Sequence, residues 1–411
     1  MSFYKEKHML KPTIIAASIA ISLAGISQAN AEQANTLTQA ITEGKASVDV
    51  RLRYEGVDQD NALKNANALT VRTRLGYTTA DFNGFSALVE FEDSRPVAGV
   101  NKYNDALGSN PEYSVIADPK TTEVDQAFLQ YKNDQFKARV GRQVIALDNQ
   151  RFVGHVGWRQ DRQTFDAVSF VYSPIKDLDA TYAYIGKRNR IFSDVRDVDS
   201  KDHLFNLGYK TAIGKISGYG YLLAEDNNTK NNLDTFGIRL AGKRQLDAFG
   251  LGYQAEFAQQ KSVKEAVEYK ANYYLLEGKA SFKPLTVTLG YEVLGSDNGN
   301  YGFATPLATL HKFNGWADQF LGTPKQGLKD LYLGLSGNIK GHNWGVTYHD
   351  FKADVSKDGV SNLGKELDVV LSRKLTDNLT AGVKYAAYMA GDSAAGKVDT
   401  NKLWVWTSLA F

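Results

Sequence analysis

Residues 403–411, the last nine of the chain, read LWVWTSLAF and decide its fold. One parity of this stretch is apolar apart from Thr407, and its members are Leu403, Val405, Leu409 and Phe411. Alternate residues of a strand share one face, so the pattern predicts an amphipathic strand that stops on a free phenylalanine. Trp404 and Trp406 have the opposite parity. Either both side chains point to the other face, or a bulge shifts the register there.

The other end of the chain has the features of a secretory leader. Three lysines, within residues 5–11, precede an apolar run over 14–23 and the small-x-small sequence Ala29-Asn30-Ala31. This pattern predicts a signal peptide over residues 1–31 and a mature chain that starts at Glu32. The apolar run is too short to span a bilayer as a helix, and a buried N-terminal helix is the alternative.

The composition excludes several classes of function. The leader holds three Lys and one Glu, so the 48 basic and 46 acidic residues of the chain become 45 and 45. A neutral mature protein argues against nucleic acid as a partner. The absence of cysteine excludes disulfides and thiolate metal sites. Many aromatic residues, with 36 Gly against 8 Pro, favour long strands joined by turns.

Period-two alternation recurs along almost the whole chain. In segment 46–56, one face carries Val48, Val50, Leu52 and Tyr54, and the other carries Asp49, Arg51, Arg53 and Glu55. The pattern predicts eighteen strands, many of them long enough to cross a bilayer at a tilt. They cover residues 46–56, 68–79, 84–93, 122–132, 135–144, 164–173, 177–187, 202–211, 214–224, 233–243, 247–260, 267–282, 284–294, 328–339, 342–353, 363–374, 377–389 and 401–411.

The connections between these segments alternate between short and mostly longer. Eight tight turns and nine longer loops, such as 94–121, 145–163 and 295–327, join eighteen strands. This alternation is typical of an all-β transmembrane antiparallel up-and-down β-barrel with short periplasmic turns and long extracellular loops. Sixteen strands remain an alternative, because segments 214–224 and 328–339 alternate poorly. Residues 32–45 form a periplasmic lead-in, residues 46–411 form the barrel, and the terminal Phe411 resembles the assembly signal of outer-membrane barrels.

The two faces of such a barrel have different surroundings. Backbone amides in lipid must pair within the protein, so the sheet closes and its apolar parity faces outer-membrane lipid. The opposite parity then lines a lumen, and its charges indicate an aqueous pore rather than a packed interior. The candidate pore-lining charges of the strands are Arg51, Arg53, Arg72, Arg74, Glu90, Glu92 and Arg139. They either impose a transverse field on a solute or pair across neighbouring strands.

The third long connection is the most distinctive stretch of the chain. With its flanks it reads GRQVIALDNQRFVGHVGWRQDRQTFDAV over residues 141–168. Gly154 and Gly157 permit sharp bends, and the mixture of Trp with apolar residues predicts a loop folded into the barrel. Arginine offers forked donors for carboxylates, while an aromatic face can stack on a sugar ring. The candidate solute-binding residues are Arg142, Asp148, Asn149, Arg151, Trp158 and Arg159; the alternative is that they only pin the loop to the wall.

The same stretch carries a resemblance to a known family. The run GRQ…DNQRFVG…WRQDRQTFDAV, after EVDQAFLQYK at 123–132 and GKASVDVRLRYEGV at 44–57, resembles the alginate-export family of outer-membrane proteins and related porins. The resemblance is clearest over residues 44–172. It implies an eighteen-stranded outer-membrane barrel that conducts an anionic or sugar-like solute, with a role for Arg51, Arg72, Arg74, Arg139, Arg142, Arg151 and Arg159. The neutral mature charge differs from that of a pore built solely for polyanions.

Other chemistry finds little support in the sequence. Six histidines show no metal-binding spacing, and no serine-hydrolase or phosphate-binding motif occurs, so we expect no enzyme, no metal and no cofactor. A calcium site among Asp194, Asp197 and Asp199 is an alternative to a solvated acidic loop. The sequence predicts a porin of a Gram-negative outer membrane for passive diffusion of small polar or anionic solutes. The alternatives are a structural or adhesive surface protein and a barrel-type hydrolase, and monomer and homo-oligomer stay open.

Overall fold

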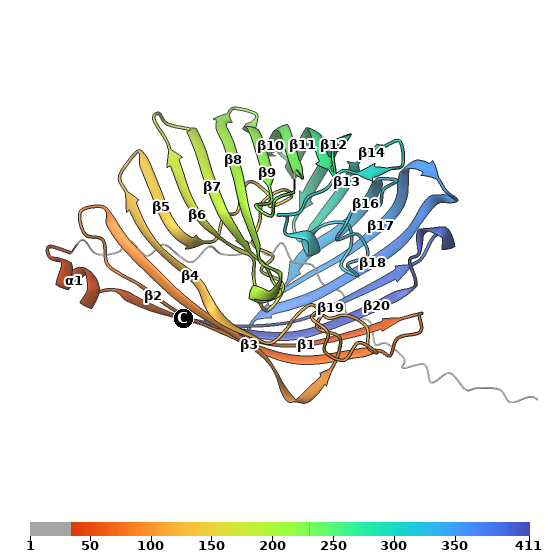
Figure 1. Cartoon of the computed structure of the whole chain (residues 1–411), viewed down its shortest axis with the longest axis horizontal. Helices are drawn as coiled ribbons and strands as arrows, with labels where there is room; N and C mark the ends of the chain where they lie inside the picture. Colours follow the sequence, from red (N-terminus) through yellow and green to blue (C-terminus); the bar gives the residue numbers. More distant parts are fainter. Residues whose placement is uncertain (1–33, 230) are drawn as a thin grey trace, which may run out of the picture.

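The computed structural model describes residues 34–229 and 231–411, which form one closed barrel (Figure 1). Eighteen antiparallel strands make a single sheet in which each strand pairs with its neighbours along the chain. The first strand also pairs with the last, so the sheet has no free edge. This confirms the predicted strand number and excludes sixteen. The predicted signal peptide over residues 1–31 lies outside the described residues.

The elements follow one another around the barrel with few interruptions. A short helix α1 (Leu37–Thr42) precedes the first strand, and Figure 1 shows it beyond one end of the strands. A small hairpin, β14 (Ser296–Asp297) and β15 (Tyr301–Gly302), lies in one loop apart from the barrel sheet. Three 3₁₀ turns are η1 (Asp194–Arg196), η2 (Leu310–Lys312) and η3 (Ser393–Ala395).

The barrel strands run from eight to eighteen residues in length. They are β1 (Lys45–Gln59), β2 (Ala66–Thr78), β3 (Phe85–Lys102), β4 (Thr121–Lys132), β5 (Phe136–Gln143), β6 (Thr164–Tyr172), β7 (Leu178–Asn189), β8 (Val198–Thr211), β9 (Gly214–Ala224), β10 (Asn232–Gln245), β11 (Gly250–Lys264), β12 (Val267–Phe282), β13 (Leu285–Leu294), β16 (Leu328–Ile339), β17 (His342–Lys357), β18 (Val360–Lys374), β19 (Leu379–Met389) and β20 (Thr400–Ala410).

Several strands are longer than the sequence pattern predicts. Strand β3 continues to Lys102, where we expected a loop to begin at residue 94. Strand β11 extends to Lys264, so only Glu265 and Ala266 separate it from β12, and the predicted loop over 261–266 is a tight turn. Both turn residues have positive φ, of 49° and 66°, which matches the right-handed twist of a two-residue hairpin. The extra residues, 94–102 of β3 and 261–264 of β11, do not alternate between apolar and polar, so the sequence pattern did not assign them to strands.

The two faces of the barrel have the predicted parities. Leu52, Leu75 and Leu276 point outward, and the Leu276 side chain is 65% exposed in the absence of lipid. Arg53 and Trp404 point inward and are fully buried. No helix within the described ranges is both long and apolar enough to traverse a bilayer.

The hydrogen bonds between β1 and β20 determine the position of β20, the strand that closes the barrel. The Phe411 N–H donates to the Val48 carbonyl at 2.9 Å, and the Val48 N–H donates to the Phe411 carbonyl at 3.3 Å. Pairing along the seam runs without a register shift, with Trp406 opposite Arg53. Trp404 and Trp406 therefore point into the barrel, and no bulge is needed to explain their parity.

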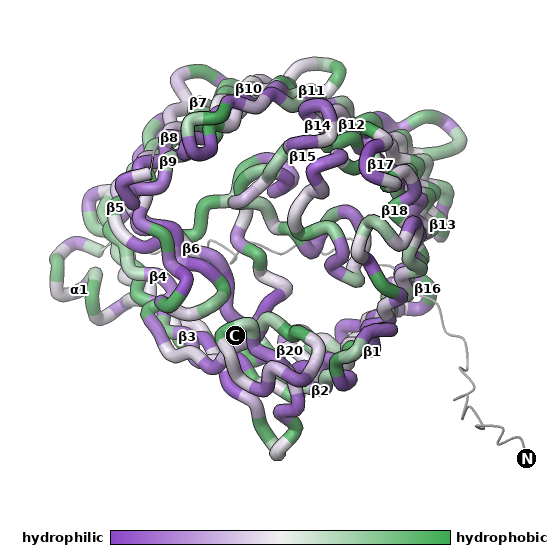
Figure 2. Tube along the Cα trace, turned by 45° about the vertical axis from the view of Figure 1, so that its right-hand side comes forward, coloured by the Kyte–Doolittle hydropathy of each residue, from purple (hydrophilic) through white to green (hydrophobic). Residues whose placement is uncertain are grey.

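The interior is not the open aqueous pore that the charged parity suggested. Two loops, 144–163 and 303–327, fold inward and bury an apolar cluster that includes Phe152, Val153, Phe303 and Leu307. Figure 2 shows chain segments crossing the space inside the ring of strands. The expectation of a wholly wet lumen is therefore wrong where these loops pack. The expectation failed because side chains and carbonyl groups of the loops form hydrogen bonds and ion pairs with the charged residues of the barrel wall. We had expected those residues to face water.

Candidate functional site

Two arginines of β1 hold the loop over 144–163 inside the barrel. Arg51 donates from Nη1 to the Gly157 carbonyl at 3.1 Å and from Nη2 to the Trp158 carbonyl at 2.9 Å. Its Nε donates to Oε1 of Gln160 at 3.0 Å. Arg53 also donates to the Trp158 carbonyl. The guanidinium group of each arginine thus binds the backbone of the loop and holds the loop against the barrel wall.

A third arginine, Arg159, ties the same loop to Glu55, Asp318 and Asp118 in three other parts of the chain. Its Nη1 lies 3.0 Å from a carboxylate oxygen of Glu55 on β1, and its Nη2 lies 2.8 Å from Asp318 in the loop over 303–327. Asp118, from the loop over 103–120, contacts Arg53 and accepts a hydrogen bond from the Gln160 N–H at 2.9 Å. These buried charges are paired with one another, which is the condition for burying them at tolerable cost.

Arg151 joins the two inward loops to the opposite wall. Its Nε lies 2.6 Å from Glu292 on β13, and its Nη2 donates to Oδ1 of Asn314 at 3.0 Å. The Gly154 N–H donates to the Leu307 carbonyl at 2.8 Å, so the two loops also pair through backbone. The pair of loops therefore behaves as one inward partition.

Trp158 lies at the centre of this partition and is already surrounded. Its ring stacks on His311 with centroids 5.4 Å apart and meets Trp406 edge-on at 5.3 Å. Lys384 lies 4.4 Å and Arg53 lies 5.1 Å from the ring centroid. These contacts pack Trp158 into the partition and leave the residue partly exposed, and its stacking on a sugar stays a prediction.

Most of the remaining predicted charges on the strands are also paired. Arg72 contacts Asp49, and Arg74 contacts Glu92. Glu90 contacts Arg162 and accepts a hydrogen bond from Gln126 at 3.0 Å. Arg142 lies 2.8 Å from Asp166. These contacts support the alternative in which the charges stiffen the wall.

The tip of the loop reaches the far wall. Asp148 accepts a hydrogen bond from Nδ2 of Asn206 at 2.7 Å and from Oγ of Ser217 at 3.0 Å, on β8 and β9. The Asn149 carbonyl accepts a hydrogen bond from Nζ of Lys312 at 2.9 Å. Arg139 on β5 makes no ion pair within the described ranges; its Nε donates to Gln130 at 2.8 Å.

The alternating parity of the sequence assigns Arg239 and Lys279 of this far wall to the lumen, but they were not among the candidate solute-binding residues. Cross-strand partners share a face, and Arg239 pairs with Ser217, which contacts the inward loop. Around it, the inward parity of β8–β12 and the inward loops gather basic side chains, with the carboxylates of Asp148, Glu256 and Glu277 among them. We define the basic wall as Lys210, Lys215, Arg239, Lys243, Lys279 and the loop residue Lys312.

The basic wall is more accessible than the arginines of β1 and β2. Lys210, Lys243, Lys279 and Lys312 are exposed, whereas Arg51, Arg53, Arg72 and Arg74 are buried. Although the Lys312 side chain is exposed to the lumen, the surrounding protein partly desolvates its ammonium group, and this, with the nearby charges of Lys279 and Arg239, lowers its pKa below the ordinary value of 10.5. Three of the six form ion pairs, Lys215 with Asp148, Arg239 with Glu256 and Lys279 with Glu277. In the described part of the chain, Lys210, Lys243 and Lys312 form none, and the alternating parity of the sequence does not distinguish paired from unpaired charges.

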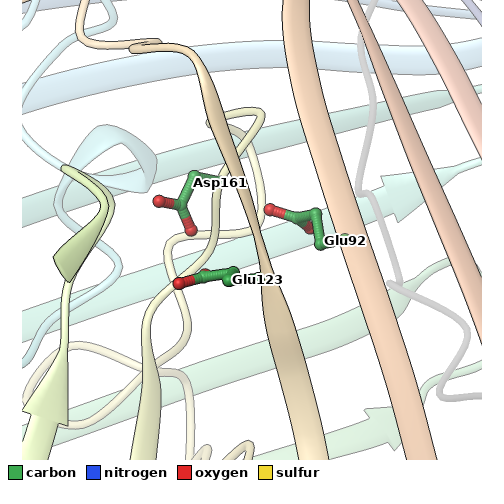
Figure 3. A group of neighbouring side chains, drawn as sticks. All are labelled: Glu92, Glu123 and Asp161. Atoms are coloured by element: carbon green, nitrogen blue, oxygen red, sulfur yellow. The ribbon is translucent and has the colours of Figure 1, made fainter.

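A compact acidic group lies where the loop meets β3 and β4. Glu92, Glu123 and Asp161 each offer one carboxylate oxygen, and these oxygens lie within 4.8 Å of one another (Figure 3). Burial, with the charges of Glu123 and Glu92, raises the pKa of Asp161 well above its usual range. Burial beside Arg162 and Arg74 lowers the pKa of the neighbouring His155 to about 4. The expected acids Asp194, Asp197 and Asp199 are not part of this group.

The family of the chain follows from a match over residues 41–303 to the family described as alginate export. This stretch holds the first strands, the inward loop and most of the basic wall. The chain belongs to the alginate export family. No curated protein matches the sequence of this family member.

Solved structures show the same fold at low sequence identity. The alginate export family barrel matches OccAB1 of Acinetobacter baumannii with a TM-score of 0.70 and 15% identity, covering 90% of this chain and 96% of that one. It matches the outer membrane protein opdK of Pseudomonas aeruginosa with a TM-score of 0.70, 11% identity and coverage of 90% and 98%. A structure of OpdK with vanillate matches with a TM-score of 0.66, 12% identity and coverage of 89% and 98%.

These findings confirm the predicted family, fold class and location. The barrel is an alginate export family protein of a Gram-negative outer membrane, and it has the architecture of a channel. Its outer face is apolar and its backbone is closed, which is what lipid requires of a spanning sheet.

Proposed function

We propose that the protein is a passive channel for small anionic solutes, such as organic acids and sugar acids. The observation that carries the proposal is the basic wall, whose six cationic side chains gather along one side of the barrel interior among the carboxylates of Asp148, Glu256 and Glu277. Cations that are exposed in a narrow, low-dielectric passage raise the local concentration of anions. Lysine and arginine also bind carboxylates directly through charge-assisted hydrogen bonds.

The inward partition supports a small solute over a polymer. The loops over 144–163 and 303–327 contact β1, β9 and β13, so they reach across the interior from several sides. A solute passing beside them would travel along the exposed part of the basic wall, past Lys210, Lys243 and Lys279. Arg139 on β5, with Lys137 beside it on the same face, extends the positive surface. The predicted solute-binding roles of the ion-paired arginines then become positioning roles for the partition.

The solved relatives are compatible with this solute class. OpdK was solved with vanillate, an aromatic carboxylate, and that barrel shares the fold of this one. We infer that a monocarboxylate of similar size fits the path beside the basic wall. That the chain has no enzymatic activity, cofactor or nucleic-acid partner stays a prediction, and so does the choice between monomer and homo-oligomer.

Conductance of the purified protein in planar bilayers tests the proposal. Under a salt gradient, the reversal potential should show a preference for anions, and vanillate or glucuronate should reduce the chloride current more than uncharged glucose does. Absence of conductance, or hydrolysis of the phospholipid, would overturn the channel. Preference for cations, with no effect of either carboxylate, would leave a channel but reject the anionic solute.

A further inference from the structure

The acidic group at the base of the inward loop brings together three segments that are distant in the sequence. Glu92 comes from β3, Glu123 from β4 and Asp161 from the loop over 144–163. Glu92 and Glu123 are directly opposite each other in the sheet. Figure 3 shows the three carboxyl groups gathered in one place. Like charges directly opposite on a sheet are destabilising unless something neutralises them.

Two oxygens in this group have no partner. Oε1 of Glu92 and Oδ1 of Asp161 are buried without a hydrogen bond from any residue in the described ranges. The Glu92 and Asp161 residues are each 1% exposed. Their other oxygens are used, because Glu92 contacts Arg74 and Asp161 accepts a hydrogen bond from the Ser193 N–H at 3.2 Å. A buried carboxylate oxygen without a partner carries a full desolvation penalty, which a bound cation would remove.

The surrounding arginines do not supply the missing charge. Arg74 contacts Glu92 and Asp125, and Arg162 contacts Glu90 and Asp125. Over residues 34–229 and 231–411, no lysine or arginine nitrogen forms an ion pair with Glu123 or Asp161. Five carboxylates thus share two guanidinium groups. The excess of negative charge is concentrated on the side where the unpartnered oxygens lie.

We propose that Glu92, Glu123 and Asp161 bind one Ca²⁺ ion. Calcium takes carboxylate oxygens at about 2.4 Å, so two oxygens on one ion lie no further apart than about 4.8 Å. The three oxygens here meet this limit. Calcium requires six to eight oxygens in total. Glu123 is only half-buried, which leaves a side open for water to complete the coordination and for the ion to enter.

The site would anchor the inward partition to the wall. Asp161 follows Gln160, which bonds to Arg51 and to Thr70, so an ion at Asp161 continues the line of contacts from β1 and β2 to β3 and β4. Binding of Ca²⁺ would therefore stabilise the folded-in position of the loop. This role does not depend on which solute the channel conducts.

Calcium binding to the whole barrel tests the proposal. The mature protein is refolded without lipopolysaccharide in a detergent, freed of metal with EDTA, and equilibrated with ⁴⁵Ca²⁺. The expected result is one bound Ca²⁺ per chain for the wild type and for Asp199→Asn, which changes an exposed acid of the neighbouring loop region. Asp161→Asn and Glu123→Gln should each weaken binding by at least about tenfold. Ca²⁺ should also raise the temperature at which the wild type loses its heat-modifiable gel mobility.

Two outcomes would overturn the calcium site. The wild type could bind no Ca²⁺, with EDTA leaving the transition temperature unchanged. In that case a more stable Asp161→Asn variant would show that the carboxyls share a proton instead. Binding that survives in both Asp161→Asn and Glu123→Gln but is lost in Asp199→Asn would place the ion elsewhere. Because Glu123→Gln is nearly isosteric and Glu123 has no ion pair, a folding defect is not expected to obscure its result.

Discussion

Arg51 donates a 2.9 Å hydrogen bond from Nη2 to the carbonyl oxygen of Trp158, across 107 residues of sequence. An arginine that alternation assigns to the lumen wall therefore holds a loop instead of facing water. The same is true of Arg53, whose side chain is fully buried against Asp118 and Glu55. The charged parity of β1 is thus the attachment site of the inward partition, and the path for solute lies along another wall.

Replacing Arg53 should destabilise the barrel strongly. The Arg53→Met variant keeps most of the side-chain volume but leaves Asp118 and Glu55 short of a buried partner. Breaking a buried pair costs about 3–5 kcal/mol. Urea unfolding in lipid vesicles, followed by tryptophan fluorescence, measures the loss.

Arg95→Met is the matched control for this experiment. Arg95 pairs with Asp93 at the surface, where both side chains are partly exposed. Exposed pairs contribute only about 0–1 kcal/mol. Equal losses in the Arg53 and Arg95 variants would contradict the buried attachment.

Reversing two charges of the basic wall should change the ion selectivity. Lys243→Glu combined with Lys279→Glu converts two exposed cations into anions and removes the partly exposed ion pair of Lys279 with Glu277, so the reversal potential should move toward cation preference. Lys176→Glu, in an exposed periplasmic turn, serves as the control and should have a smaller effect. An unchanged reversal potential in the double variant would remove the basic wall from the solute path.

The arginines of β2 should respond differently to the same change. Arg72→Glu with Arg74→Glu would place new carboxylates beside Asp49, Glu92 and Asp125 in buried positions. We expect a low yield of heat-modifiable barrel rather than a folded channel with altered selectivity. A well-folded double variant with reduced anion preference would return these arginines to the pore-lining role that the sequence suggested.

As pH rises, the preference for anions should begin to fall at a lower pH than the deprotonation of an ordinary lysine would predict. The pKa of Lys312 is lowered by partial desolvation of its ammonium group and by the charges of Lys279 and Arg239, so its cation is lost as pH rises, at a pH below 10.5. Below that range the charge is fully present. Reversal potentials recorded from pH 7 to pH 10 check this. Lys312→Arg retains its charge over the whole range, so it should show a weaker decline.

Trp404 and Trp344 should differ in what they contribute to the stability of the barrel and to its single-channel current, although both lie on strands. Trp404 is fully buried in the interior and meets Trp158 edge-on at 6.0 Å. Trp404→Ala should cost about 3–5 kcal/mol and make single-channel currents noisier, because the partition loses packing. Trp344 has the outward parity, opposite Leu371, so Trp344→Ala should leave the currents unchanged. Equal current noise in the two variants would contradict the central place of Trp404.

The fold of this chain follows from local patterns. Leu403 faces lipid and Trp404 faces the interior, because successive side chains of a strand point to opposite faces. The sequence of a single strand is enough to show this alternation. The even strand number and the closed sheet follow from the same alternation, since a spanning sheet in lipid must leave no backbone edge unpaired. The pattern failed only where strands leave the membrane, as between β11 and β12.

The sequence by itself determined that this protein is an eighteen-stranded barrel with an apolar belt and a charged interior. Only the tertiary structure decided which charges remain available to a solute. Arg51 and Lys279 have the same parity and the same sign, yet one is buried against loop carbonyls while the other is exposed. Alternation reports the direction of a side chain relative to its own strand. It carries no information about which distant loop arrives there, because that depends on contacts between residues more than a hundred positions apart.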